Sequence, residues 1–353
     1  MDNAPLHDLL ATRGKKILLY HTDVDGICSA ALFQRFFVGY STIPLEGPII
    51  SDKLLGVLSS EKPRVITALD LPIDQEWKKI GKLLIALPSA RIAIIDHHVP
   101  LKDMNSERIM HVNPRFLSNA YIPASVLVYR MLLDMGKDAG DLVWIAAVGV
   151  IGDFAYVDCA DILRECEKKY PALCEGKLDK AETLSKKLMS AVILEGAKGA
   201  EKALAVMLAA KGAQDMLSDP YLNACYDSVE KEIDAAVGGF AEKSEKIPSI
   251  GLYLYEVQSK LNIASTVSTR VAALNPDKMI FIVKHSGPFV KVSARYQKGD
   301  ISLNDLFKEV TKGIGSGGGH EKAAGAVVER KHWDEFRMRV VARLTEMKMK
   351  NGL

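Results

Sequence analysis

Ionisable side chains follow several apolar segments in the first part of the chain. IAIIDHHVP, residues 92–100, begins as a buried strand and ends in Asp96, His97 and His98. Each of these groups costs free energy if it is buried without a partner. Such groups are expected at the carboxyl end of a parallel strand, because open α/β sheets bind ligands there. The three residues therefore indicate a metal-dependent hydrolytic site.

A second group of ionisable residues follows KKILLY, residues 15–20. His21, Asp23 and Asp25 alternate along the chain, and Gly26 leads into a segment with helical apolar spacing. Alternate side chains of an extended segment point to the same side, so these three can converge. Two carboxylates and an imidazole at one point favour a cation between them. The alternative is that one aspartate only caps the helix that follows.

The elements between these groups predict one shared edge. RVITAL, residues 64–69, is a strand that ends at Asp70, and 74–87 has helical periodicity before the strand at 91–95. Strands joined by helical crossovers predict a parallel, doubly wound sheet, with all strand-end groups at one edge. Asp70 alone would be read as a cap or turn residue, but its place in this series makes it a candidate ligand.

The end of the predicted domain carries one more acid. Residues 108–112 form another expected strand, Arg115 lies in the turn after it, and helices are expected at 122–135 and 142–153. The last helix is rich in small residues and ends near Asp153. Because helix C-termini do not favour acids, Asp153 is either a turn residue or a final ligand.

Four segments together resemble the motifs of the DHH phosphoesterase superfamily. They are HTDVDG at 21–26, the strand-end Asp70, DHH at 96–98 and GVIGD ending in Asp153. The resemblance covers roughly residues 15–155. The superfamily includes RecJ-type single-strand exonucleases, nanoRNases, cyclic-dinucleotide phosphodiesterases and family II pyrophosphatases.

The resemblance implies a site for two Mn²⁺ ions, with Mg²⁺ or Co²⁺ as substitutes. His21 and Asp23 would hold one ion. Asp25 and His97 would hold the other, and Asp70 would bridge the two. Imidazole and carboxylate ligands together suit manganese better than calcium.

The same resemblance implies roles for three further residues. Asp153 would complete the metal ligands, Asp96 would orient a ligand histidine, and His98 would face the substrate phosphate. Two cations about 4 Å apart can lower the pKa of a bridging water and stabilise an in-line displacement at phosphorus. Arg115 is a further candidate for binding the substrate.

A segment without strand signals separates this domain from the end of the chain. Residues 158–247 are rich in Ala, Lys, Glu and Leu, which predicts a helical connector. Its lysines either are solvated or contact a nucleic-acid backbone. GGFAEKSEKIPS, residues 238–249, has the composition of a domain boundary.

The C-terminal part predicts a smaller α/β domain. Strands are expected at 250–256, 279–284 and 289–295, with helices at 262–274 and from about 302. Residues 313–319 contain five glycines, whose flexible backbone could wrap an anion such as phosphate. A flexible turn is the alternative reading.

GGGHEKAAGA in this segment resembles the glycine–histidine motif of the DHH-associated C-terminal domain, which binds the nucleotide part of substrates. Residues 250–330 are covered by that resemblance. It implies that substrate is bound by Ser293, Arg295, Gly317, Gly318, Gly319 and His320. A nucleotide-containing substrate is therefore expected rather than pyrophosphate.

The length and composition of the whole chain limit which classes of protein are possible. It has 353 residues, a formal net charge of +2 and no apolar run of the roughly 20 residues that a membrane span needs. This small net charge gives no strong positive field of the kind that a protein coating nucleic acid has. An anionic partner must therefore be bound by a local patch of basic residues. The five cysteines match no zinc or redox spacing. Without a signal peptide pattern, a cytoplasmic protein with reduced thiols is expected.

We therefore expect an α/β enzyme with a parallel-sheet catalytic DHH domain (1–157), a helical connector (158–247) and a smaller α/β substrate-binding domain (248–353) across a cleft. The expected activity is manganese-dependent hydrolysis of single-stranded DNA or RNA ends, or of short oligonucleotides, to mononucleotides. A cyclic-dinucleotide phosphodiesterase and a non-catalytic replication-associated scaffold remain as alternatives. Replication or repair proteins are candidate partners. The sequence does not determine whether the substrate is DNA or RNA, the polarity of cleavage or the oligomeric state.

Overall fold

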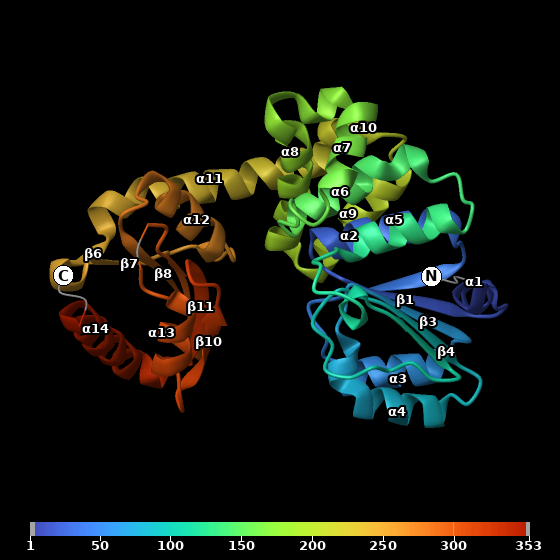
Figure 1. Ribbon diagram of the computed structural model, residues 1–353, viewed down its shortest axis with the longest axis horizontal. Coiled ribbons are helices and arrows are strands. Elements are labelled where there is room, and N and C mark those ends of the chain that lie inside the picture. Colours follow the sequence, from blue (N-terminus) through green and yellow to red (C-terminus); the bar gives the residue numbers. More distant parts are fainter. Residues whose placement is uncertain (1–3, 299, 351–353) are drawn as a thin grey trace. The chain divides into compact units, whose positions relative to one another are not determined.

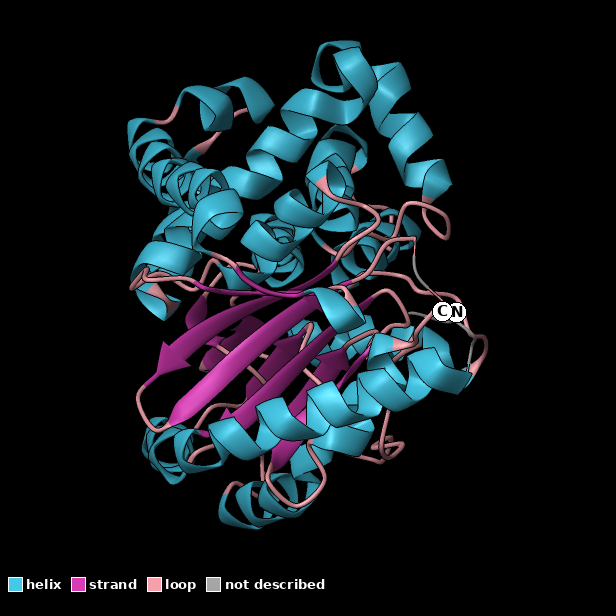
Figure 2. Ribbon diagram, turned by 90° about the vertical axis from the view of Figure 1, so that its left-hand side faces the viewer, coloured by secondary structure: helices cyan, strands magenta, loops and turns pink. Residues whose placement is uncertain are grey.

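The computed structural model describes residues 4–298 and 300–350. Their packing divides the chain into two compact units, Met1–Tyr226 and Asp227–Leu353. Both units contain strands and helices, drawn in magenta and cyan in Figure 2. The predicted α/β class is confirmed.

Unit 1 is built on a five-stranded sheet of order β2-β1-β3-β4-β5, in which every pair is parallel. Figure 1 shows helices on both faces of this sheet, with α3 and α4 on one side and α2, α5 and α6 on the other. The strands are β1 (Lys16–His21), β2 (Tyr40–Leu45), β3 (Val65–Leu69), β4 (Arg91–Ile95) and β5 (Ile109–Val112). The predicted parallel sheet is present.

The edge strand β2 was not predicted. Pro44 lies within it, and a proline has no N–H for a sheet ladder. Because β2 pairs with β1 alone, it forms an edge of the sheet, where such a residue is tolerated. Its half-buried pattern also lacks the continuous apolar run of β1 and β3.

The helices of unit 1 cover both faces and continue beyond residue 157. They are α1 (Ala4–Ala11), α2 (Val24–Phe36), α3 (Asp52–Glu61), α4 (Trp77–Ala86), α5 (Ala124–Asp134), α6 (Val143–Gly152), α7 (Ala160–Lys169), α8 (Pro171–Glu195), α9 (Ala197–Ala209) and α10 (Ala213–Ser218). Short 3-10 turns lie at Ile73–Glu76, Pro114–Phe116 and Gly140–Leu142.

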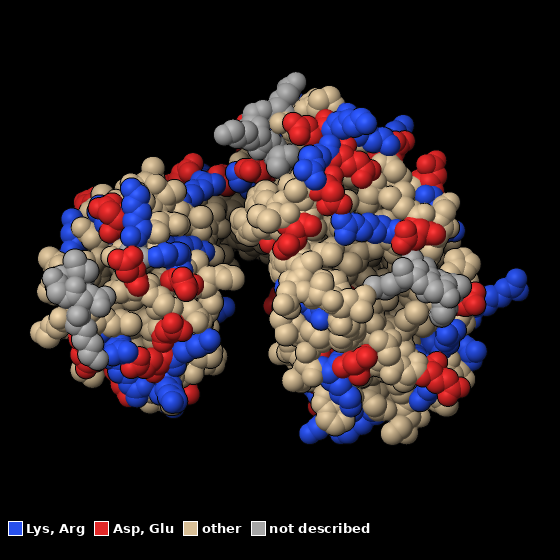
Figure 3. Space-filling view, viewed as in Figure 1, with Lys and Arg blue, Asp and Glu red and all other residues tan. Residues whose placement is uncertain are grey.

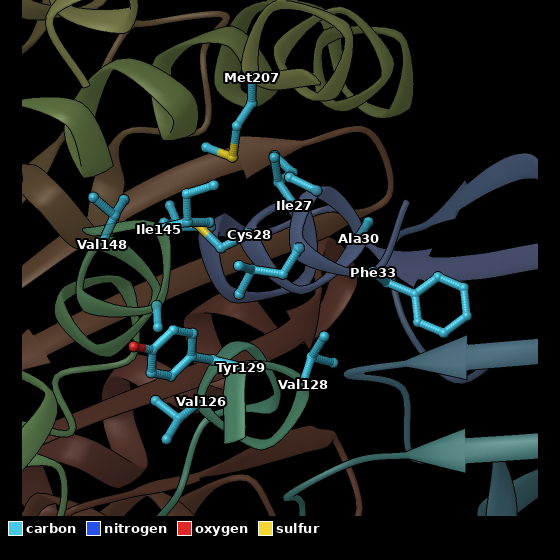
Figure 4. Packing of buried hydrophobic residues seen from close by; sticks show 14 of the residues in the cluster. Ile27, Cys28, Ala30, Phe33, Val126, Val128, Tyr129, Ile145, Val148 and Met207 are labelled. Atoms are coloured by element: carbon cyan, nitrogen blue, oxygen red, sulfur yellow. The ribbon is translucent and has the colours of Figure 1, made fainter. Parts of the chain in front are cut away.

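Helix α2 lies at the centre of the main core of unit 1. Its buried face is made of small and apolar residues, so neighbouring helices can approach it closely. Figure 4 shows this packing among Ile27, Cys28, Ala30, Phe33, Val126, Val128, Tyr129, Ile145, Val148 and Met207. Since Met207 belongs to α9, part of the predicted connector packs on the catalytic core. The predicted division into three parts stays a prediction.

Helix α11 (Pro220–Lys243) contains the boundary between the units. Unit 2 has a six-stranded mixed sheet of order β10-β11-β9-β8-β7-β6, in which only β7 and β8 pair in parallel. Its elements are β6 (Glu245–Ile247), β7 (Leu252–Glu256), α12 (Ala264–Leu274), β8 (Met279–Ser286), β9 (Phe289–Arg295), α13 (Leu303–Val310), β10 (Gly315–Gly319), β11 (Ala323–Glu329) and α14 (Trp333–Lys350), with 3-10 turns at Pro248–Ile250 and Arg330–His332.

The glycine segment was expected to have a flexible backbone, with a flexible turn as the alternative, and the structure shows a strand instead. Gly315–Gly319 form the edge strand β10, which pairs antiparallel with β11. A β-carbon on Gly317 would lie 2.9 Å from Thr311 Cγ2 and 3.0 Å from Phe307 O. Glycine is therefore required there because helix α13 packs closely on the strand.

Two general expectations concern the whole chain. Within residues 4–298 and 300–350, no helix is both long and apolar enough to cross a membrane. All five cysteines are buried and none forms a disulfide. Lys and Arg are interspersed with Asp and Glu on the face shown in Figure 3, in agreement with the small net charge.

Candidate functional site

The candidate metal centre lies where β1, β3 and β4 end. His21 is the last residue of β1, Asp70 directly follows β3, and Asp96 directly follows β4. The three strands are neighbours in the sheet and run parallel, so their carboxyl ends share one edge (Figure 1). This is the edge at which open parallel sheets bind ligands.

Seven side chains form three overlapping groups whose nitrogen and oxygen atoms lie within 4.8 Å of one another. Asp70 and His97 each belong to two of the groups. The groups are His21 with Asp23 and Asp70, Asp70 with His97 and His98, and Asp25 with His97 and Asp153. All six residues predicted as metal ligands are therefore brought together, with His98 beside them.

Asp70 occupies the middle of this arrangement. Its carboxylate oxygens lie 3.4 Å from His21 Nδ1 and 3.1 Å from His97 Nε2. Asp70 is 1% exposed, and within the described part of the chain neither oxygen has a hydrogen-bond partner of good geometry. A buried carboxylate without partners is costly. A divalent cation is the partner that such an oxygen lacks.

The backbone of Asp70 supports the same conclusion. Its φ is 58°, in the left-handed region that residues other than glycine rarely adopt. Strained backbone of this kind persists where the surrounding structure requires it, and it concentrates at functional sites. Here the strain holds a carboxylate at the junction of two ligand groups.

Asp23 has two roles in the structure. One oxygen accepts a hydrogen bond from Gly26 N at 2.8 Å and caps helix α2, and the other lies 2.7 Å from His21 Nδ1. Asp23 can therefore both cap helix α2 and act as a metal ligand. A β-carbon on Gly26 would lie 2.1 Å from His21 O, so only glycine allows the helix to start this close to the strand.

Asp25 is fully buried and connects the centre to helix α5. Its oxygens accept hydrogen bonds from the backbone N–H groups of Ala124 at 2.6 Å and Ser125 at 3.0 Å. Gly149 of α6 lies opposite, where a β-carbon would come within 2.8 Å of Asp25 Oδ1. The small residues noted in this helix therefore leave room for a metal ligand.

Asp96 contacts a different histidine from the one that the resemblance suggests. Its Oδ1 lies 2.8 Å from His98 Nδ1, so it orients His98. His98 is 40% exposed at its side chain, whereas His97 is 2% exposed. Its outward position is compatible with the predicted role at the substrate phosphate, which stays a prediction.

Tyr121 is a site residue that sequence reasoning missed. Its hydroxyl donates a hydrogen bond of 3.1 Å to Asp153 Oδ2, and its ring packs edge-on against His97 with centroids 4.9 Å apart. The guanidinium of Arg115 lies over the same ring at 5.5 Å. No motif marks this tyrosine, because only folding of the segment 113–123 brings it to the centre.

Arg115, predicted to bind substrate, is tied to the centre through the backbone. Its Nε donates to His97 O at 3.4 Å and its guanidinium donates to Asn119 O at 2.7 Å. Nearby, Asn113 donates to His98 O at 2.9 Å. These bonds fix the chain after DHH.

The raised pKa values of the buried carboxylates show that burial and mutual repulsion disfavour their charged forms. Burial and the charges of Asp23 and Asp25 raise the pKa of Asp70 well above its ordinary value. Burial, with the charge of Asp25, raises the pKa of Asp153 to about 8. Burial also raises the pKa of Asp25. Bound cations would relieve this repulsion, so the residues present fit a metal centre.

The histidine–carboxylate pair behaves in the opposite way. Burial opposes charge on both groups, but the nearby carboxylates of Asp23 and Asp70 raise the pKa of His21 to about 10. The partnership with His21 outweighs burial and lowers the pKa of Asp23 to about 2. A proton on His21 therefore offsets part of the negative charge of these carboxylates.

Unit 2 contains a separate pocket of about 640 Å³. Its walls come from the start of α12 and from strands β9, β10 and β11. Polar or basic side chains in the lining are Asn262, Ser265, Lys291, Ser293, Arg295, Ser316 and His320. Much of the remaining wall is glycine and alanine, so the pocket owes its space to missing side chains.

Comparison with solved structures places the fold. An exonuclease RecJ bound to manganese matches with a TM-score of 0.70 and 17% identity over 97% of this chain and 92% of that chain. RecJ from Thermus thermophilus in complex with Mn²⁺ matches with a TM-score of 0.71 and 17% identity, over 97% of this chain and 54% of that chain. CDC45 from Entamoeba histolytica matches with a TM-score of 0.56 and 10% identity, over 97% of this chain and 98% of that chain. The chain thus spans about half the length of the Thermus protein.

The sequence comparison concerns the C-terminal part. Residues 251–346 match the DHHA1 domain. The chain has a RecJ-like DHH fold and carries a DHHA1 domain. The resemblance inferred from the motifs is confirmed at this level. No curated protein matches the sequence.

The DHHA1 domain places its predicted substrate residues around the pocket. Those that line it are Ser293, Arg295, Gly317, Gly318, Gly319 and His320. Ser293 Oγ lies 2.9 Å from Ser268 Oγ, and Arg295 donates to Ser265 Oγ at 3.3 Å. These bonds hold the polar side chains of β9 against α12. Their role in binding substrate stays a prediction.

Proposed function

We propose that this protein is a metal-dependent phosphodiesterase that hydrolyses short oligonucleotides or single-stranded nucleic-acid ends to mononucleotides. The observation that carries the proposal is the buried, unpartnered carboxylate of Asp70 at the junction of two ligand groups. RecJ structures that share the fold contain Mn²⁺ or Mg²⁺, which supports a divalent ion here, and the mixture of imidazole and carboxylate ligands favours Mn²⁺.

The ligands of the two ions would be His21, Asp23, Asp25, Asp70, His97 and Asp153. Bound there, two divalent ions would lower the pKa of the attacking water and neutralise charge on the phosphate. His98 is placed to donate a hydrogen bond to a phosphate oxygen, and Asp96 holds its ring in position. The buried surroundings of the carboxylates strengthen each of these charge interactions.

The DHHA1 domain supports a nucleotide as the substrate. Its pocket offers Arg295 and His320 as positively charged or proton-donating groups beside a floor of glycine and alanine. An arginine can bind phosphate through two parallel hydrogen bonds. Glycine and alanine leave a flat surface against which a base or sugar can lie.

A direct assay separates this proposal from its alternatives. The purified protein with Mn²⁺ would be given labelled single-stranded DNA, short RNA and cyclic di-AMP. We expect mononucleotides from the linear substrates, at a higher kcat/KM than for cyclic di-AMP. Preferential cleavage of cyclic di-AMP would favour a cyclic-dinucleotide phosphodiesterase.

The non-catalytic alternative has its own outcome. CDC45 shares the fold, and by fold alone a scaffold is an alternative to an enzyme. If no substrate were hydrolysed and no Mn²⁺ were bound, the enzyme proposal would be refuted. The scaffold reading, with replication or repair proteins as partners, would then be preferred.

A further inference from the structure

Phe154 occupies a backbone position that usually belongs to glycine. Helix α6 ends at Gly152, and Phe154 follows with a φ of 56°. Phe154 N donates to Ile151 O at 3.2 Å and Ala155 N donates to Val150 O at 3.0 Å. These two bonds define a Schellman motif, whose left-handed residue is most often glycine. A phenylalanine here is strained by its backbone.

Packing gives no reason for a phenylalanine at this place. Its side chain is 79% exposed, so burial of the ring contributes little to folding. Its ring lies beside that of Tyr156, with 6.3 Å between the centroids and an angle of 59° between the planes. The ring therefore lies outside the core, supported on one side, at a cost in backbone strain and exposed apolar surface.

The position of Phe154 in the chain suggests what the ring contacts. It directly follows Asp153, one of the candidate metal ligands, and adjacent α-carbons are about 3.8 Å apart. A phosphate at the metal centre carries a sugar and base within a few ångströms. Aromatic side chains bind bases by stacking, and they do so without sequence preference because every base has a π-face.

We propose that Phe154 is a stacking platform for a nucleobase next to the hydrolysed phosphate. This inference rests on the proposed function, which supplies the nucleotide. A protein partner is disfavoured because Phe154 and the neighbouring exposed Val157 together offer far less area than a stable protein interface of about 1,200 Å² or more. The turn sets the direction of the Cα–Cβ bond of Phe154, and the exposed ring can rotate about its side-chain bonds to meet a base.

The test combines variants of Phe154 with modified substrates. Short oligonucleotides that each lack one base would be hydrolysed by the wild type to find the position where the missing base lowers kcat/KM most. In Phe154→Gly and Phe154→Leu this loss should shrink, by roughly five- to a hundredfold. Phe154→Tyr should retain it, because its ring still stacks.

Stability provides a second readout with the opposite sign. Phe154→Gly should raise Tm, since glycine adopts a positive φ without strain. Lys62→Gly is the matched control, because Lys62 is also exposed and left-handed, with a φ of 48° at the end of α3. The control should raise Tm and leave the dependence on the missing base unchanged.

The outcomes distinguish this inference from the proposed function. If Phe154→Gly raises Tm but keeps the wild-type dependence on the missing base, the stacking role is refuted. If the wild type hydrolyses neither oligonucleotides nor bis(p-nitrophenyl) phosphate with Mn²⁺, the proposed function fails. In that case, 2-aminopurine oligonucleotides still decide the role of the ring. Fluorescence quenching on binding that is lost in Phe154→Leu supports stacking, and unchanged quenching refutes it.

Discussion

The two units prepare their sites in opposite physical ways. Unit 1 concentrates buried ionisable groups at the edge of a parallel sheet, and the charges repel one another until a cation binds. Unit 2 removes side chains, so that glycine and alanine leave a pocket with a few polar groups at its border. The first arrangement suits catalysis by metal ions and the second suits recognition by shape. Substitutions in the two units should therefore have different signatures.

The largest effect is expected for Asp70→Asn. Loss of the carboxylate at the junction of the ligand groups should lower kcat/KM by roughly a thousandfold, because two-metal stabilisation would contribute several kcal/mol. The metal-free variant should nevertheless unfold at a higher temperature than the wild type at neutral pH, since the costly buried charge is gone. Calorimetry after chelation, together with turnover, measures both. A lower Tm would mean that Asp70 is a structural residue.

The second effect is the dependence of metal binding on pH. Burial raises the pKa of Asp153 to about 8 in the metal-free protein, so below pH 8 a proton must leave before the ion binds. Mn²⁺ affinity should fall by at least about tenfold per pH unit between pH 8 and pH 6, because His21, with a pKa of about 10, must also lose a proton. Titration calorimetry at several pH values measures this. An affinity that is constant over that range would contradict the raised pKa.

The sign of the accompanying change in stability follows from the same carboxyl. A group whose pKa is raised by folding stabilises the folded state at low pH, and this contribution is lost as pH rises through the folded pKa. For Asp153 the loss falls between about pH 4 and pH 8. The gain in Tm on adding Mn²⁺ should therefore be larger at pH 8 than at pH 6.

A smaller effect is expected for Tyr121→Phe. The variant keeps the ring against His97 and loses only the hydroxyl that donates to Asp153. Residues that orient metal ligands typically contribute 10- to 100-fold to affinity or activity, so roughly tenfold weaker Mn²⁺ binding is expected. Equal affinity in the variant and the wild type would show that the hydroxyl does not orient Asp153.

The smallest effect is expected in the pocket of unit 2. Gly325 lines the pocket, and the nearest atom to an added β-carbon is Val292 O at 3.6 Å. Gly325→Ala should leave stability nearly unchanged and raise KM for oligonucleotides by roughly tenfold, about 1.4 kcal/mol. The contrasting variant is Gly317→Ala, which should lower Tm because Thr311 and Phe307 leave no space. An unchanged KM in Gly325→Ala would place the substrate elsewhere.

Sequence reasoning located the strand-end residues because their chemistry and spacing are local. Asp70 and His97 follow the apolar strands β3 and β4, and parallel topology brings such strand ends together, whereas Asp153 follows helix α6 and was expected to be a ligand from the resemblance. Tyr121 could not be found in this way, since its contact with Asp153 depends on the path of a loop.

Two further features could not be read from the sequence. Asp96 was expected to orient a ligand histidine, and it contacts His98, because residues two apart on a chain leaving a strand point to the same side. The glycines at 315–319 were read as flexible. Composition alone does not reveal that helix α13 needs them for close packing on β10.

The central claim is that Asp70 lies between two bound metal ions. Its most direct test is the number of Mn²⁺ ions per chain, measured by native mass spectrometry after dialysis against micromolar Mn²⁺. The account predicts two ions in the wild type and a loss of at least one in Asp70→Asn. A wild-type protein that binds no Mn²⁺, or an Asp70→Asn variant that still binds two, would contradict it.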